Sequence, residues 1–430
     1  MSLFRLPARA RAPRSSVALL LCVAALGTAL AACTPAPSSS GEDSRQARVP
    51  ARSAAVVTPW ALPAPAGAGQ PDLATSPEGN LLLSWVEPGA EDTHRLRLSS
   101  MSPTADAGWQ PALTVAEGRK WFLNWADTPH VYALPDGSLW AHWLRGTGPA
   151  RMDYGIDLVR SGDGGRSWSA PTLVHPAGTR GDHGFVTFWA QGPDQLGLAW
   201  LDSRQKAAAM AAGPVHEDDH HGGGAPMMLR AALYGSQATQ QAEWPLDAST
   251  CDCCTTASAM TDRGVVVVYR GRDAGEIRDT RIVRFDGKAW TSPRDVHADG
   301  WRIAGCPVNG PVVVARGVQV WAAWYTEADG LPELRAARSD DAGDHFGEPV
   351  TLARGPQVLG RLSLALARDR LLAAWLETAE DAPQRIVLGR YDLHWRDSER
   401  VIVAPIAARG RASGLPRVRW VGQAAWLVWT

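Results

Sequence analysis

The stretch at residues 128–175 reads TPHVYALPDGSLWAHWLRGTGPARMDYGIDLVRSGDGGRSWSAPTLVH. Its apolar runs are divided by turn residues, first Pro135-Asp136-Gly137 and then a glycine-rich segment from Ser161 to Trp168. β-Rich runs bounded by Pro, Asp and Gly are typical of strands joined by tight turns. We therefore predict an antiparallel sheet of four strands here. Because such a sheet has two faces to bury, it needs similar sheets beside it.

The first two strands of this unit have counterparts along the whole chain. Each counterpart places a turn between two β-rich runs and ends near an aromatic residue. The seven hairpins span residues 71–86, 129–144, 185–201, 256–270, 311–325, 362–376 and 415–430. A strand-only repeat of about 40–60 residues predicts a β-propeller. We expect an all-β fold, a single β-propeller of four-stranded antiparallel blades, with seven blades favoured and six as the alternative.

The two ends of the folded body are expected to close the ring. The last hairpin ends with the chain, whereas residues 56–62 resemble the fourth strands of other repeats. Pairing this N-terminal stretch with the C-terminal hairpin would remove exposed sheet edges. The predicted propeller therefore spans residues 54–430.

One turn motif recurs at equivalent places in two repeats. Its Asp caps backbone N–H groups, its Gly tolerates a positive φ, and its aromatic residue covers the edge of the blade. The two copies consist of Ser161, Asp163, Gly165 and Trp168, and of Ser339, Asp341, Gly343 and Phe346. This pattern resembles the Asp-box, or BNR repeat, of sialidase-type propellers. The resemblance covers the whole body and implies a sialidase-like fold, but not an activity.

The start of the chain is expected to direct export. Four arginines precede an apolar run at residues 17–30, and the run ends in Leu30-Ala31-Ala32-Cys33. This ending resembles the bacterial lipobox, which implies removal of residues 1–32 as a signal peptide and lipidation of Cys33. An ordinary secretory signal is the alternative. Residues 33–53 are predicted to be a flexible tether, and Thr34 after the cysteine favours the outer membrane, facing the periplasm or the cell surface.

Charge excludes some partner classes. The formal net charge is −1, and loss of the four signal arginines leaves −5. This balance argues against nucleic acid and against an anionic membrane surface as partners. We expect a monomer that meets the membrane only through its lipid.

Loops at one end of the propeller are the expected ligand site, because many of them converge there on a concave space. Asp127, Glu276 and Tyr325 are weak catalytic candidates. Arginines on different blades suit a carboxylated ligand because a guanidinium grips a carboxylate in bidentate fashion. The predicted ligand-binding residues are His183, Arg270, Arg278, Asp279, Arg302, Asn309 and Arg361. Acids that follow the second strands, namely Glu87, Asp202, Glu327 and Glu377, belong to the same end.

Four cysteines remain once those of the signal and the lipid site are set aside. They are Cys251, Cys253, Cys254 and Cys306, in the loops of two adjacent repeats. An even number in an exported protein favours disulfides. The alternative is a copper or zinc site of thiolates, with His183 as an added ligand. A histidine- and methionine-bearing insertion at residues 210–228 is either a second soft-metal loop or a polar surface loop.

Three functions follow from these patterns. The Cys-Asp-Cys-Cys segment and its neighbours resemble an exported bacterial subgroup of sialidase-like propellers. The first hypothesis is a lipid-anchored protein that binds a small anionic ligand, a carboxylated sugar, at the channel mouth. The second is an exo-α-sialidase or other glycoside hydrolase; its Arg-Ile-Pro motif is absent after residue 32, so enzymatic activity stays undecided. The third is a protein that binds copper or zinc through its cysteines.

Overall fold

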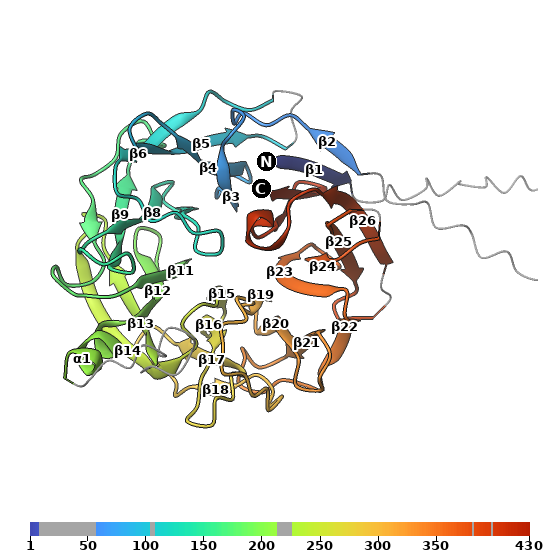
Figure 1. Cartoon of the computed structure of the whole chain (residues 1–430). Helices are drawn as coiled ribbons and strands as arrows, with labels where there is room; N and C mark the ends of the chain where they lie inside the picture. The colour runs from blue at the N-terminus through green and yellow to red at the C-terminus, as the bar shows by residue number, and fades with distance from the viewer. Residues whose placement is uncertain (8–56, 104–107, 213–225, 381, 397–398) are drawn as a thin grey trace, which may run out of the picture.

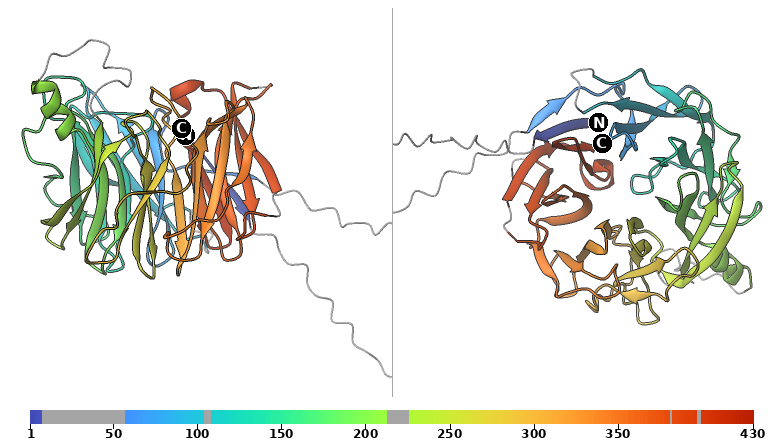
Figure 2. Two further views of the ribbon diagram at one scale, coloured as in Figure 1. Left: turned by 90° about the horizontal axis from the view of Figure 1, so that it is seen from below. Right: turned by 180° about the vertical axis from the view of Figure 1, so that it is seen from behind.

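The protein is a ring of seven four-stranded antiparallel sheets around a central axis (Figure 1). The computed structural model describes residues 1–7, 57–103, 108–212, 226–380, 382–396 and 399–430. The prediction of an all-β propeller with seven blades is confirmed, and the six-bladed alternative is wrong. Seen from the side, the strands run along the ring axis (Figure 2).

Six blades are built from consecutive strands, numbered outward from the axis. Blade one is β3(Gly69–Thr75), β4(Leu81–Pro88), β5(His94–Met101) and β6(Leu113–Gly118); blade two is β7(His130–Ala133), β8(Leu139–Gly146), β9(Tyr154–Ser161) and β10(Thr172–Leu173). Blade three is β11(His183–Ala190), β12(Leu196–Asp202), β13(Met227–Tyr234) and β14(Gln240–Thr250); blade four is β15(Ala257–Thr261), β16(Gly264–Arg270), β17(Thr280–Phe285) and β18(Arg294–Asp295). Blade five is β19(Val312–Arg316), β20(Gln319–Thr326), β21(Glu333–Ser339) and β22(Val350–Arg354); blade six is β23(Val358–Leu366), β24(Leu371–Glu377), β25(Gln384–Tyr391) and β26(Glu399–Ile406).

Blade seven joins the two ends of the chain, in the order β27(Arg417–Val421), β28(Ala424–Trp429), β1(Ser2–Pro7) and β2(Thr58–Trp60). The outermost strand β2 lies within the stretch that the sequence assigned to ring closure. The third strand β1 was not anticipated, because it falls inside the predicted signal peptide. Leu3 and Leu6 are buried in it. A chain cleaved before Cys33 would lack β1; Cys33 and the tether lie outside the described residues.

The aromatic residues that end the repeats form the packing between blades. Trp85, Trp200 and Trp375 are fully buried on the second strands. Their indole N–H groups donate to the acid two residues later, Glu87, Asp202 and Glu377, at 2.8, 2.9 and 2.9 Å. A buried indole N–H needs such an acceptor. These acids therefore supply the acceptors that the buried indole N–H groups of the blade core need.

The recurring turns at residues 161–168 and 339–346 adopt the same local structure. In the first, Asp163 accepts hydrogen bonds from Ser161 Oγ (2.8 Å) and from Ser167 N (2.9 Å) and Oγ (2.7 Å). Gly165 has φ +88° and Gly343 has φ +84°, a region that L residues rarely adopt. Hydrogen bonds from Ser167 and Ser161 hold the pKa of Asp163 well below its ordinary value.

Little of the described chain is helical. The helix α1(Arg204–Ala212) follows β12 and ends within the predicted insertion at residues 210–228, and a short 3-10 helix, η2(Gly410–Ser413), precedes β27. Residues 213–225 of that insertion, with its histidines, lie outside the described residues. Neither helix has the length and apolar character that crossing a membrane would need.

Candidate functional site

A cavity of about 380 Å³ lies on the ring axis, and all seven innermost strands line it. Alternate residues of a strand face the same side, so each inner strand sends side chains into this channel. Most of the wall is apolar or carries hydroxyl groups. Its charged and titratable groups are Asp72, Asp127, His130, Arg417 and Arg419, joined by the phenol of Tyr132.

Asp72 organises the cationic side of the wall. Its carboxylate lies 3.0 Å from His130 Nδ1 and 3.4 Å from Arg417 Nε. Arg417 also donates from Nη2 to Thr128 Oγ1 at 3.0 Å. Burial alone would raise the pKa of Asp72, but His130 and Arg417 outweigh it and hold that pKa far below its ordinary value. Asp72 is thus a fixed anion between two basic groups.

Asp127 has a different environment on the same wall. Its Oδ1 accepts the backbone N–H of Phe185 at 2.8 Å, while its buried Oδ2 has no hydrogen-bond partner among the described residues. The Gly184 backbone packs closely against this oxygen, because a Cβ added to Gly184 would lie 2.0 Å from Asp127 Oδ2. Burial raises the pKa of Asp127 to about 7, and Asp182 adds to the effect. Near neutral pH this carboxyl holds a proton it can release.

Bulges shape the mouth of the channel. The first strands of blades one, three and six each shift register near a residue with positive φ: Gln70 (+50°), Phe185 (+55°) and Arg361 (+59°). A bulge reorients side chains locally and is common next to binding sites. At Phe185 it presents the backbone N–H to Asp127.

Arg270 is buried and bonded to backbone. Its guanidinium donates to the carbonyl oxygens of Arg278 (2.6 Å), Asn309 (2.8 Å) and Tyr325 (2.8 Å). It also lies 4.9 Å over the ring of Trp301. These partners tie blade four to blade five, so Arg270 is used by the fold.

Glu276 holds two further arginines beside Arg270. Arg278 Nη2 donates to Glu276 Oε2 at 2.7 Å, and Arg272 Nη2 donates to Glu276 Oε1 at 2.6 Å. Asp279 accepts the backbone N–H groups of Gly300 and Trp301, at 2.8 and 3.0 Å. Arg302 is exposed, and its backbone forms an isolated antiparallel β-bridge with Ile277.

Asn309 and Arg361 connect this corner to blade six. Asn309 Oδ1 accepts the backbone N–H of Arg361 at 2.7 Å and so fixes its positive-φ conformation. The Arg361 guanidinium donates to the carbonyls of Gly410 (2.8 Å) and Gly414 (3.0 Å) and lies 4.4 Å over Trp125. Among the described residues no carboxylate pairs with it, and burial lowers its pKa to about 10. Arg361 is an uncompensated cation.

His183 does not join these residues. It is buried in β11, stacks on His175 with 3.7 Å between ring centroids, and has Nδ1 3.4 Å from Asp202 Oδ2. Tyr325, at the end of β20, donates its hydroxyl hydrogen bond to Glu327. Burial, followed by Glu327, raises the pKa of Tyr325 far above its ordinary value.

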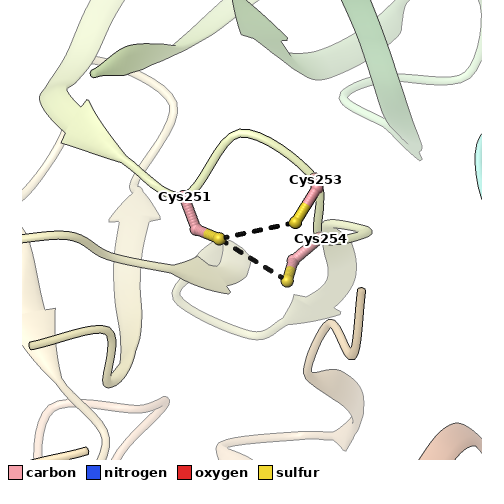
Figure 3. Close-up of side chains that lie close together, drawn as sticks. All are labelled: Cys251, Cys253 and Cys254. Carbon is pink, nitrogen blue, oxygen red and sulfur yellow. Dashed lines mark hydrogen bonds between the residues drawn. The ribbon is translucent and has the colours of Figure 1, made fainter. Parts of the chain in front are cut away.

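Three cysteines converge between blades three and four, as Figure 3 shows. Cys251 Sγ lies 3.8 Å from the sulfurs of both Cys253 and Cys254, and the three sulfurs lie within 4.8 Å of one another. Cys251 and Cys254 are buried, and Cys306 is exposed on the loop before β19. These four cysteines are all free thiols. Hydrogen bonds from Cys253 and Cys254, with the charge of Arg278, lower the pKa of Cys251.

Of the charged residues of the channel wall, the sequence predicted Asp127 alone as a site residue. Four others lie within the predicted first strands rather than in loops and were not predicted: Asp72, His130, Arg417 and Arg419. The available signal was a charge inside a run expected to be an innermost strand. At such a position an ionisable side chain faces the axis or a neighbouring blade.

Comparison with known proteins supports the architecture. No protein-family model matches the sequence, and no curated protein matches it. Among solved structures, a polysaccharide lyase described as an ulvan lyase has a TM-score of 0.50 at 13% identity, covering 77% of this chain and 80% of that one. The polysaccharide lyase Uly1 gives 0.48 at 12% identity, with coverage of 85% and 90%. A Hadza microbial sialidase gives 0.41 at 16%, with coverage of 72% and 63%. At 13% identity the likeness to the ulvan lyase concerns the fold alone.

Proposed function

We propose that the protein is an exported, lipid-anchored propeller that binds a small anionic ligand, a carboxylated sugar, in its axial channel. The supporting observation is the composition of the 380 Å³ cavity wall. Arg417, Arg419 and His130 stand there against one fixed anion, Asp72, and one carboxyl with a pKa of about 7, Asp127. The volume falls in the range of about 300–1,000 Å³ that is usual for small-molecule sites.

Charge selects the class of ligand. While Asp127 holds its proton, the two arginines exceed the single charge of Asp72, so the wall is cationic. In a partly desolvated cavity a charge interaction is several times stronger than in water. A guanidinium also matches a carboxylate in shape, because it offers parallel N–H donors. A monocarboxylate is therefore favoured over a neutral sugar.

The choice of a sugar acid has two supports. Hydroxyl-bearing residues Thr256, Ser258 and Ser363 line the cavity among apolar ones, so hydroxyl groups of a ligand would meet polar as well as apolar surface. The solved structure with the TM-score of 0.50 is that of a polysaccharide lyase. Sugar acids are accordingly the first ligands to test.

Calorimetric titration tests this proposal. Glucuronic acid and N-acetylneuraminic acid should bind, and methyl glucoside should bind at least about tenfold more weakly, because it lacks the charge. Arg419→Gln should weaken binding of the acids about tenfold or more. The matched control is Arg354→Gln, an exposed arginine on the outer strand β22, which should leave affinity unchanged. Equal binding of the neutral sugar, or no effect of Arg419→Gln, would reject the proposal.

Export through a lipoprotein signal is the second part of the proposal. Intact-mass measurement of protein from the bacterial membrane fraction should give a chain that starts at Cys33 with attached acyl chains. A soluble chain that keeps residues 1–32, and with them β1, would contradict it.

Glycoside hydrolysis is a second candidate, favoured by the hydrogen bond between Tyr325 and Glu327. The sialidase resemblance implies a Tyr nucleophile activated by Glu, and Asp127 with a pKa of about 7 suits a general acid. A fluorogenic sialoside tests it: turnover that Tyr325→Phe abolishes would support it. Absence of turnover across about pH 4–8, the range in which such acids act, would reject it.

A further inference from the structure

The sulfurs of Cys251, Cys253 and Cys254 have the spacing of ligands to one metal ion. Metal–sulfur bonds of about 2.3 Å place the sulfurs of a tetrahedral site about 3.8 Å apart, and those of a trigonal site about 4.0 Å apart. The two observed distances from Cys251 are both 3.8 Å. The three side chains point toward one another from one loop (Figure 3).

Rigid elements hold this spacing in place. Cys251 directly follows β14 and donates its backbone N–H to Arg270 O at 3.0 Å. Cys254 lies three residues before β15, and Thr256 between them is anchored by its hydroxyl to Phe185 O at 2.7 Å. The loop thus spans two fixed strand ends. A site held by such elements is preorganised for its ligand.

Cationic groups surround the sulfurs. Arg278 is buried and donates from Nη1 to Cys251 Sγ at 3.4 Å, while Glu276 fixes its other nitrogens. Lys206 of α1 pairs at 2.7 Å with Asp252, which stands between Cys251 and Cys253 in the sequence. N–H donors to thiolate sulfur orient a metal ligand and offset its negative charge. This shell suits three thiolates on one ion.

Cys306 supplies a fourth sulfur from the neighbouring blade. Its side chain is exposed to solvent, and after Cys251 and Cys254 it is a further group that raises the pKa of Cys253. The site therefore has three clustered sulfurs and one peripheral sulfur. Three soft ligands suit copper(I), whereas four complete the tetrahedron that zinc prefers.

We propose that Cys251, Cys253 and Cys254 bind one thiophilic ion, copper(I) or zinc, with Cys306 completing the site when the ion is zinc. The site is separate from the axial channel and does not depend on the anionic ligand proposed there. None of these four cysteines lines the axial cavity. A bound ion is expected to keep the thiols from oxidising.

Anaerobic titration of the reduced full-length protein tests this site. Copper(I) is supplied in competition with a bathocuproine chelator, and zinc with a colorimetric chelator. One equivalent of ion should bind, and Cys251→Ser should weaken binding at least 100-fold. Cys306→Ser should weaken zinc binding more than tenfold but copper(I) binding by less than threefold, which distinguishes the two ions.

A second readout covers the case in which Cys251→Ser does not fold. Bound ion should protect three cysteines of the parent protein from iodoacetamide, as peptide mass spectrometry would show. Anionic-ligand affinity should not change on metal loading, so failure of either proposal can be recognised separately. Binding of fewer than 0.2 equivalents of both ions, or alkylation that the ions do not slow, would overturn the site; so would disulfides that re-form in the presence of either ion.

Discussion

Asp163 in an outer turn and Asp127 in the channel wall are the same residue type in opposite situations. Asp163 is solvated and accepts hydrogen bonds from Ser161 and Ser167, so its pKa lies well below the ordinary value. Asp127 is buried, accepts one backbone N–H, and leaves Oδ2 without a described partner. Its pKa rises to about 7. Burial without enough donors accounts for the difference.

The same contrast separates the arginines. Arg270 has three backbone carbonyls around its guanidinium, whereas the one acceptor that Arg419 has among the described residues is Val418 O, its neighbour in sequence. Polar groups whose hydrogen bonds are complete hold blades together. Those with spare capacity inside a cavity are the groups a ligand can satisfy. Arg270 and the outer turns thus have their hydrogen bonds completed by the fold, whereas the channel wall keeps the free polar groups that the proposed ligand site requires.

The largest effect is expected from Arg270→Met. This change leaves three buried carbonyls without a donor, which should lower the free energy of unfolding by about 3–5 kcal/mol. Urea denaturation measures it. Arg419→Gln, the matched change at the channel, should cost less than about 1 kcal/mol. A reversed order would break the distinction between structural and binding arginines.

The next effect concerns pH. The folded pKa of Asp127 is about 7, above its unfolded value, so the folded state binds the extra proton between about pH 4 and 7. Its contribution is thus most favourable below pH 4 and is lost as pH rises through 7. Asp127→Asn should remove this pH dependence. The free energy of unfolding of the variant should therefore rise by a few kcal/mol relative to that of the parent as pH increases from 4 to 8.

Denaturation at several pH values gives the difference in the free energy of unfolding between the parent and Asp127→Asn. The buried histidines contribute equally to both proteins and so do not affect this difference. His175, with a pKa lowered to about 4 by burial, destabilises both proteins equally as pH falls below 6.5. A gap between parent and variant that stays constant with pH would contradict the raised pKa.

The smallest effect separates two glycines in turns. Gly343 has φ +84°, and an added Cβ would lie 2.9 Å from Ile282 Cδ1, whereas Gly137 has φ +82° and open space around its Cβ position. Gly137→Ala should cost about 1 kcal/mol for the backbone alone. Gly343→Ala should cost about 1 kcal/mol more for the contact. Thermal melts of both variants check the order; equal losses would show that the turn does not pack on blade four.

The fold could be predicted because its signals are local. Alternating strands, turn residues and the recurring aromatic residues fix the hairpins, and all seven have their predicted places. Two elements were not predicted, β1 and α1. β1 has the basic and apolar residues of a targeting segment, and α1 is an alanine-rich stretch next to a predicted loop, so composition favoured other assignments.

The candidate site was only partly predictable because it depends on side-chain direction. Asp127 lines the axial cavity, whereas Arg361 and the four cysteines are not among the residues of its wall. His183 precedes the bulge at Phe185, and the shifted register leaves it stacked on His175. Arg270 and Arg278 lie in the expected corner, but neighbouring carbonyls and Glu276 occupy their donors. Such pairing arises from segments distant in sequence, which one sequence does not reveal.

The most direct test of the channel assignment is the affinity for glucuronic acid at pH 6 and pH 8, measured by calorimetry on the parent, Asp127→Asn and Arg419→Gln. As Asp127 loses its proton the wall gains a negative charge beside Arg417, Asp72 and His130. The parent should therefore bind more weakly at pH 8, Asp127→Asn should keep more of its affinity there, and Arg419→Gln should bind poorly at both values. Affinity that is the same at both pH values and in all three proteins would contradict an anion site in the channel.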